Sequence, residues 1–342
     1  MTVSSDSGTR RRPRLRRVVV AAVLMLFTVE LILGWPSLAS AFGHLRAPRP
    51  GWLAGAVAAE LIAMGAYARM QRSLLRSAGV QVPIYRHLAL AYAAHSLSVT
   101  LPAGPAFSTR FNYQQMRRFG ATPAVATWCI TLSAILSAAA LALITVAGAL
   151  VSHGTPQWYG LAGLAAAAVL ITAGIRQAIH RPETLKAPIR RALIRVNRMR
   201  RRATDHGLHR VDDFIDQLGA ARLRPGRGAA AAAFAVLNWA ADAVCLWMCL
   251  HAISDASIAA SQVLLAFCAG MAAGTLTVIP GGLGIIDSAL ILGLVTGGVD
   301  VSTAIATVVL YRLISFVFII GIGWITWLII RHRHRDQMTA HP

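Results

Sequence analysis

The residues of this chain that could do chemistry are ionisable side chains inside long apolar stretches. Arg312 is the most informative, because it lies about 13 Å into the apolar stretch 303–330 at a rise of 1.5 Å per residue. Asp287, Asp242 and Glu60 also interrupt apolar stretches. A charged side chain at the centre of a membrane costs roughly 2.5–3.5 kcal/mol on insertion scales, so each of these needs a partner charge or a wet cavity.

Two interpretations of these charges are compatible with each other. In the first, Arg312 forms an internal ion pair with Asp287 or Asp242 and holds the two halves of the chain together. In the second, the charges bind or gate a substrate. Neighbouring polar residues, Asn238 before Asp242 and Tyr311 before Arg312, are candidates for the same site.

Two apolar stretches are broken by proline and glycine, and they must position this chemistry. The stretch 88–104 ends at Pro102 and Gly104, and Arg110 follows that break. The stretch 258–297 is interrupted at Pro280, Gly281, Gly282 and Gly284. Such a break frees backbone N–H groups and exposes a positive helix end, which suits an anionic headgroup.

The composition places these elements in a membrane. Hydrophobic residues make up 56% of the 342 residues and charged residues only 13%, against about a quarter in soluble domains. This composition does not favour a soluble enzyme, and it excludes intrinsic disorder for most of the chain. A spanning helix needs about 20 apolar residues. The stretches that qualify or nearly do are 18–35, 52–70, 124–151, 158–175, 229–250 and 303–330.

The basic residues set the orientation. The chain has 33 Lys and Arg against 13 Asp and Glu, and most of the basic ones lie in 1–17, 69–86, 176–228 and 331–342. The positive-inside rule puts these segments, and therefore both termini, in the cytoplasm. Anionic lipid at that face explains the net charge of +20 better than nucleic acid does, and no nucleic-acid partner is predicted.

Parity then determines how the broken stretches cross. Segment 69–86 is inside, 152–157 lacks basic residues and is outside, and only 124–151 can make a full crossing between them. The region 88–118 must therefore enter and leave from the cytoplasm as a re-entrant hairpin. Parity also permits a second re-entrant hairpin over 258–297, entering from outside. Two full crossings would satisfy parity there as well, but 285–297 is short for a span. The predicted fold is all-α, with about six transmembrane helices and two re-entrant hairpins.

The two halves of the chain resemble each other at an offset of 178 residues. Pro102 meets Pro280, Gly104 meets Gly282, and Gly120 meets Gly298. Their opposite orientations predict inverted repeats, which are typical of transporters with a site between the halves. The predicted organisation is a basic N-terminus (1–17), a first repeat (18–151), a second repeat (152–330) with the basic loop 176–228, and a basic tail (331–342).

Motifs of other chemistries are absent from the sequence. GxxxxGK[ST], HExxH, GxSxG and CxxC do not occur. We predict no ATPase, no catalytic residues, no metal site and no cofactor.

The sequence resembles the flippase-like transmembrane family related to lysylphosphatidylglycerol synthases. The resemblance rests on Pro280–Asp287, Tyr311-Arg312, Asn238-Trp239 with Asp242, and Leu101–Gly104 with Arg110 and Gly120. It departs from the family pattern in having Asp287 where Glu is usual, and Ala103-Gly104-Pro105 where glycines are commoner. The family's two re-entrant hairpins agree with the parity argument. Its full-length synthases carry a soluble aminoacyl-transfer domain that is not found before Pro342, so that activity is not expected here.

The expected function is to move, or help to move, an anionic lipid between the leaflets of the plasma membrane. The candidates are a phospholipid or a polyprenyl-phosphate-linked precursor. One alternative is a membrane enzyme or subunit of polyprenyl-phosphate glycolipid synthesis, with a cytoplasmic glycosyltransferase or synthase as partner. A second alternative is a non-transporting anchor for a partner protein.

The parity argument predicts the accessibility of inserted tags and labels. Tags within 153–156 and 253–256 are expected to react from outside, and tags within 200–210 only from inside. A cysteine placed at Gly120 is expected to label from the cytoplasm with a membrane-impermeant thiol reagent. Labelling of that cysteine only from outside would contradict the first re-entrant hairpin.

Overall fold

The computed structural model describes residues 48–101, 103–152, 225–255, 258–275, 280–282 and 284–339, and every regular element in these residues is helical. Four helical segments among them are long and apolar enough to cross a membrane: Pro50–Ser77, Pro123–Val151, Gly226–Ile253 and Val301–His332. The all-α membrane fold is thereby confirmed, and these segments correspond to four of the six predicted spans. The predicted spans 18–35 and 158–175 lie outside the described residues.

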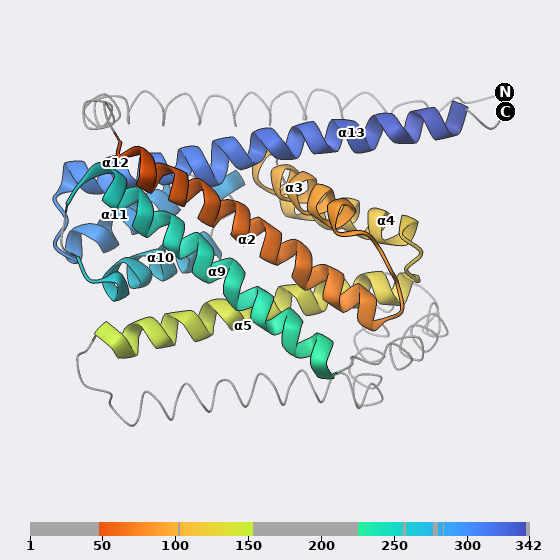
Figure 1. The fold of residues 1–342 in the computed structure, drawn as a ribbon, viewed down its shortest axis with the longest axis horizontal. Coiled ribbons are helices and arrows are strands. Elements are labelled where there is room, and N and C mark those ends of the chain that lie inside the picture. The colour runs from red at the N-terminus through yellow and green to blue at the C-terminus, as the bar shows by residue number, and fades with distance from the viewer. Residues whose placement is uncertain are drawn as a thin grey trace, which may run out of the picture.

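Helices α2 (Pro50–Ser77) and α9 (Pro225–Ile253) form the centre of the bundle and pack along most of their length (Figure 1). They are antiparallel, because the start of each contacts the end of the other. The backbone N–H of Arg49 donates to the carbonyl of Ala252 at 2.9 Å, and Arg227 donates to the carbonyl of Arg76. Arg49 also forms an ion pair with Asp255 at this end.

The two broken stretches form antiparallel helical hairpins. In the first, α3 (Ile84–Thr100) and α4 (Gly104–Arg118) pair so that His87 at the start of α3 contacts Phe119 just after α4. In the second, α10 (Ala260–Thr275) and α11 (Ile285–Thr296) lie close together, and a Cβ on Gly293 would lie 2.6 Å from the Cβ of Ala266. Small residues permit this approach between helices in a membrane. The position of both helix breaks therefore matches the sequence prediction.

The last span differs from the regular helix expected over 303–330. Helix α12 (Val301–Arg312) continues into a π-helical segment (Leu313–Phe318) and then into α13 (Ile319–Thr339). The π segment begins directly after Arg312, and such segments occur often at functional sites. Ser315 and Phe316 of this segment line the same cavity as Arg312.

Each hairpin packs against the long last helix of the other half. Helix α3 lies along α13, where the Ser96 hydroxyl donates to the carbonyl of Ile320 at 3.2 Å. Helix α10 lies along α5 (Pro123–Ser152), where Gly148 faces Leu264. The two halves show the same order of elements, a long helix, a hairpin and a second long helix. The inverted repeat and the domain boundaries at 1–17, 18–151, 152–330 and 331–342 stay predictions.

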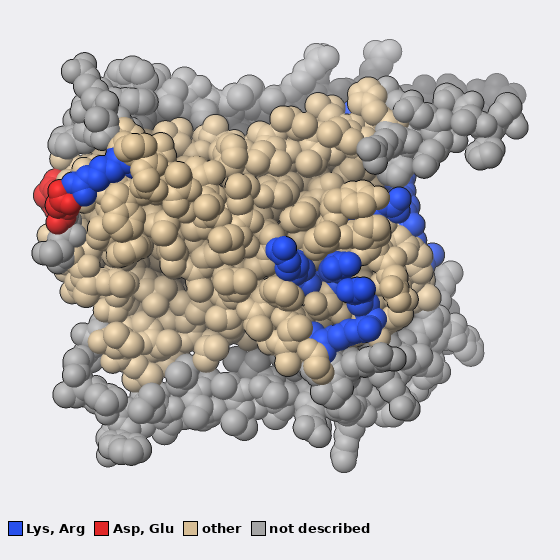
Figure 2. Space-filling view, in the orientation of Figure 1, with Lys and Arg blue, Asp and Glu red and all other residues tan. Residues whose placement is uncertain are grey.

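Charged side chains are confined to small parts of the visible surface. Figure 2 shows a wide face of the described residues without charge, one acidic and basic cluster at one end, and a group of basic side chains toward the other. Several large apolar side chains on the surface are exposed, among them Ile62, Ile135 and Leu292. This distribution suits a bundle whose sides face lipid.

The contact between α3 and α13 predicts a difference between two glycines of one helix. A Cβ on Gly323 would lie 1.8 Å from the Ser96 Oγ and 2.4 Å from the Tyr92 carbonyl oxygen, whereas a Cβ on Gly321 would meet nothing within 4 Å. Gly323→Ala is expected to lower the free energy of unfolding by about 1–3 kcal/mol through overpacking. Thermal unfolding in detergent would measure this.

The matched control is Gly321→Ala, which is expected to leave the melting temperature unchanged or to raise it slightly, since alanine favours the helix. Equal melting temperatures for the two variants would show that α3 and α13 do not pack in this way.

Candidate functional site

A cavity of about 730 Å³ opens between the two halves of the bundle. Its wall includes residues of both hairpin breaks, Leu101 and Ala103 in the first and Gly281 and Gly282 in the second. The long helices contribute the polar groups Glu60 (α2), Asp242 (α9), Tyr311 and Arg312 (α12), and α3 contributes His95 and Ser98. Volumes of 300–1,000 Å³ are usual for ligand pockets.

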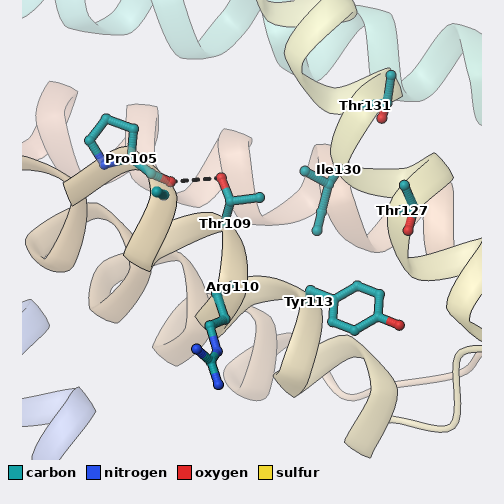
Figure 3. A pocket seen from close by; sticks show the side chains of 8 residues that line it. Pro105, Thr109, Arg110, Tyr113, Thr127, Ile130 and Thr131 are labelled. Carbon is teal, nitrogen blue, oxygen red and sulfur yellow. Dashed lines mark hydrogen bonds between the residues drawn. The ribbon is translucent and has the colours of Figure 1, made fainter. Parts of the chain in front are cut away.

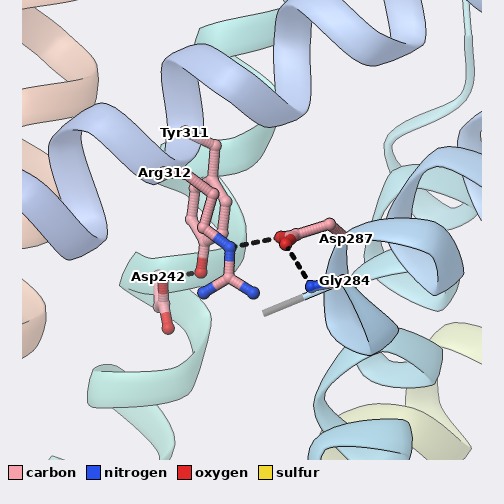
Figure 4. A network of polar contacts seen from close by, with 5 residues as sticks. All are labelled: Asp242, Gly284, Asp287, Tyr311 and Arg312. Atoms are coloured by element: carbon pink, nitrogen blue, oxygen red, sulfur yellow. Dashed lines mark hydrogen bonds and ion pairs between the residues drawn. The ribbon is translucent and has the colours of Figure 1, made fainter. Parts of the chain in front are cut away.

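Arg312 forms an ion pair with Asp287 on α11 (Figure 4). The Nε of Arg312 donates to one carboxylate oxygen of Asp287, and the other oxygen accepts from the backbone N–H of Gly284 at 2.9 Å. Asp287 therefore stabilises the N-terminus of α11 and partners Arg312 at the same time. Both side chains are mostly buried, at 17% and 24% exposure, so this pair ties the second hairpin to α12.

Tyr311, the residue before Arg312, contacts the other acid. Its hydroxyl donates to Asp242 on α9 at 2.8 Å, and its side chain is buried (Figure 4). Consecutive residues of α12 thus bind two acids that come from different elements, α9 and α11.

Glu60 from α2 completes the polar wall. Its carboxyl group interacts electrostatically with that of Asp242, and both residues line the cavity. Only 5% of Glu60 is exposed, and its Oε2 has no hydrogen-bond partner among the described residues.

Arg312 keeps an unused donor. Its Nη2 is buried and has no hydrogen-bond partner among the described residues. A guanidinium has five N–H donors and suits the oxygen pair of a phosphate. The first turns of α4 and α11 also line the cavity, through Gly104, Pro105 and Ile286. Two helix N-termini carry partial positive charge toward the same space.

The glycines of the two breaks are required by conformation and by space. Gly281, Gly282 and Gly284 have positive φ values of +70°, +63° and +82°. A Cβ on Gly281 would lie 2.6 Å from the ring of Phe316 and 3.4 Å from the carbonyl oxygen of Val99, so the two hairpin tips lie against each other. A Cβ on Gly104 would lie 2.0 Å from the Ser98 carbonyl oxygen. Larger residues at these positions would displace the cavity wall.

The structure brings most of the predicted site residues together. Those that line the cavity are Glu60, Asp242, Tyr311, Arg312, Gly104, Gly281 and Gly282. Asp287 and Gly284 are joined to it through the Arg312 ion pair. Asn238 is not part of the wall, although its neighbour Trp239 is. Pro102 lies outside the described residues, and Pro280 begins the short 3₁₀ turn Pro280–Gly282.

Arg110 lies elsewhere. It lines a separate groove of about 650 Å³ between α4 and α5, with Thr109, Tyr113, Thr127 and Ile130 (Figure 3). The prediction placed it near the first break as an added positive charge. Pro105 and Ala106 at the start of α4 border both spaces, whereas Gly104 lines only the cavity and Arg110 only the groove.

Sequence reasoning missed His95, Ser315 and Phe316. Ser315 and Phe316 follow Tyr311 and Arg312 by four residues, which places them on the same helix face, and that spacing could have found them. Phe316 also lies under the Arg312 guanidinium, whose Cζ is 5.9 Å from the ring centroid. His95 is a polar residue in the apolar stretch 88–104 and could have been found by the argument used for Glu60.

The family described as "Lysylphosphatidylglycerol synthase TM region" matches residues 15–323 of the chain. The chain belongs to this family. No curated protein matches the chain. Three of the residues that carry the family resemblance lie together in the structure. Asp287 accepts from the backbone N–H of Gly284 and from Arg312. As a member of a membrane family with four apolar spanning helices in its described part, the protein is a multi-pass membrane protein.

The Arg312–Asp287 pair predicts a pattern of folding stability. Arg312→Ala leaves the buried Asp287 carboxylate without its cation and is expected to cost up to about 3–5 kcal/mol. The double variant Arg312→Ala with Asp287→Asn removes both charges and is expected to recover much of that stability. Thermal unfolding of the purified variants in detergent would measure both changes.

Arg49→Ala is the control, since it breaks an ion pair that is exposed at the end of the bundle. It is expected to change the melting temperature little. A double variant as unstable as Arg312→Ala alone would contradict the coupling of the two charges.

Proposed function

We propose that this protein moves, or helps to move, an anionic lipid across the cytoplasmic membrane, with the lipid headgroup bound in the cavity beside Arg312. The observation that carries the proposal is the buried Nη2 of Arg312, which lines the cavity and has no partner among the described residues. A buried donor without an acceptor costs free energy, and a phosphate oxygen is an acceptor of suitable charge.

The charge pattern favours an anion over a neutral headgroup. Arg312 supplies a fixed positive charge, and its Nη2 is available because the ion pair with Asp287 uses Nε. The N-termini of α4 and α11 add the positive ends of two helix dipoles. A lipid phosphate is the anion for which a guanidinium is best suited, since two N–H groups can bind two oxygens.

The apolar part of the wall favours a lipid over a soluble anion. Val99, Leu101, Met271 and Ile286 line the same cavity as Arg312, and the bundle exposes large apolar side chains on its surface. The name of the family refers to lysylphosphatidylglycerol, which is a phospholipid. A polyprenyl phosphate offers the same chemistry, a phosphate at the end of an apolar chain.

Movement between leaflets is supported by the position of the cavity. It lies where two helical hairpins, each broken near its tip, meet beside the packed antiparallel helices α2 and α9. Broken helices that line a cavity at a repeat interface are typical of transporters that alternate access to a central site.

The experiment is lipid translocation in proteoliposomes. The protein is reconstituted with a trace of headgroup-intact, acyl-labelled fluorescent phosphatidylglycerol, and dithionite bleaching reports the lipid that reaches the outer leaflet. Arg312→Ala is expected to slow movement by about tenfold or more, because a hydrogen bond to a charged group contributes about 1.5–3 kcal/mol. Labelled phosphatidylcholine is expected to move less.

The double variant Arg312→Ala with Asp287→Asn separates binding from folding. It is expected to recover stability while lipid movement stays lost, whereas Arg49→Ala is expected to move lipid at the wild-type rate. Wild-type translocation by a folded double variant would show that Arg312 is structural only. Absence of translocation by the wild type with phosphatidylglycerol and with a labelled polyprenyl phosphate would overturn the proposed function.

A further inference from the structure

Two carboxyl groups from antiparallel helices meet in the wall of the cavity. Glu60 on α2 and Asp242 on α9 both line the cavity, Glu60 is only 5% exposed, and the two carboxyl groups interact electrostatically. An ionised carboxylate only accepts hydrogen bonds, so two neighbouring carboxyl groups can bond to each other only when one of them carries a proton. Two acids in the wall of one cavity, one of them with a buried oxygen that has no partner among the described residues, suit a pair that shares one proton.

The pair has no cation of its own among the described residues. Arg312 is the guanidinium of the cavity wall, and its Nε is bound to Asp287. Three carboxyl groups thus lie around one guanidinium. Two carboxylates in contact repel each other strongly away from water, and one proton relieves that repulsion.

The remaining titratable neighbours do not replace the missing positive charge. The groups that face the pair are Cys245 and Cys249 from α9, Tyr311 and Arg312 from α12, and Tyr92 and His95 from α3. Asp287 from α11 lies beyond the Arg312 guanidinium. Helix α5 also packs against α2, but its Cys129 contacts Gln71, about three turns from Glu60. Glu60 Oε2, buried and without a partner among the described residues, is the acceptor left open in this cluster.

Asp242 also connects the pair to the proposed anion site. It accepts from Tyr311, which precedes Arg312, and it lies on the other side of the Arg312 guanidinium from Asp287 (Figure 4). When both acids are ionised, the charge of Asp242 attracts the free guanidinium N–H groups and repels a headgroup. When the pair holds a proton, those groups are free to bind a phosphate.

We propose that Glu60 and Asp242 form a proton-binding site of the cavity, and that an anionic headgroup binds beside Arg312 when this pair holds a proton. The inference rests on the proposed function. The balance is simple: two carboxylates and one proton from water give one carboxylic acid hydrogen-bonded to one carboxylate, with one negative charge in place of two. The proton returns to water when the headgroup leaves, and no covalent bond to the lipid forms or breaks.

Infrared spectroscopy tests the proton site without any lipid. The wild-type protein in detergent, exchanged into deuterated buffer, is expected to show a carboxylic acid C=O band at neutral pH, where ordinary Asp and Glu are ionised. The band is expected to disappear in Glu60→Gln and in Asp242→Asn, and to persist in the control Asp255→Asn at the exposed ion pair. Absence of the band in the wild type, or its persistence in both variants, would overturn the proton site.

Translocation at several pH values tests the coupling. With labelled phosphatidylglycerol at a concentration below saturation, the wild-type rate is expected to rise as the pH falls, by up to about tenfold per pH unit for one coupled proton. The residual rate of Glu60→Gln is expected not to vary with pH, and Asp242→Asn provides a second test if that variant does not fold. Wild-type translocation that does not vary with pH would overturn the coupling and leave the proposed function intact. Absence of translocation by the wild type at every pH would instead overturn the proposed function.

Discussion

A guanidinium inside a membrane needs a partner of opposite charge, and the arrangement of this bundle follows from that requirement at Arg312. Its partner Asp287 lies in the first turn of α11 and also caps that helix through Gly284. The hairpin must therefore break just before Asp287. The neighbouring Tyr311 fixes α9 through Asp242. One turn of α12 thus determines where α9 and α11 lie, and the space left between them is the cavity.

The breaks impose a second constraint, since unpaired backbone groups cannot face lipid. The structure satisfies it by burying each tip against the other half. Gly281 of the second break lies against Phe316 and close to the Val99 carbonyl of the first hairpin. Helix α3 in turn lies along α13, and α10 lies along α5. Neither hairpin is supported by its own half alone, so the two halves stabilise each other across the cavity.

Much of this arrangement could be predicted from sequence, because few charged residues and few backbone conformations are tolerated inside a membrane. Apolar length and the Pro280–Gly284 break were sufficient to locate the four spans that the structure describes and the break of the second hairpin. The sequence narrowed the partner of Arg312 to Asp287 or Asp242 but could not choose between them. Only the packing of the helices determines which acid binds the guanidinium. The position of Arg110 in the neighbouring groove could not be predicted for a similar reason. The rotation of α4 about its axis depends on which face packs against α3, and the polar residues around α4 do not reveal it. The meeting of Glu60 with Asp242 depends on the register between α2 and α9.

The π-helical segment after Arg312 determines the direction in which the later side chains of the last span face. A π turn carries one residue more than an α turn, so it shifts the angular phase of all later residues by about 100°. That shift lets one continuous rod present Arg312 to the cavity and, further along, Gly323 to the backbone of α3. If this segment became a regular α-helix, α13 would rotate as a unit. Gly323 would then no longer face the backbone of α3. A single inserted residue therefore sets the angle between the face of the span that carries Arg312 and the face that carries Gly323.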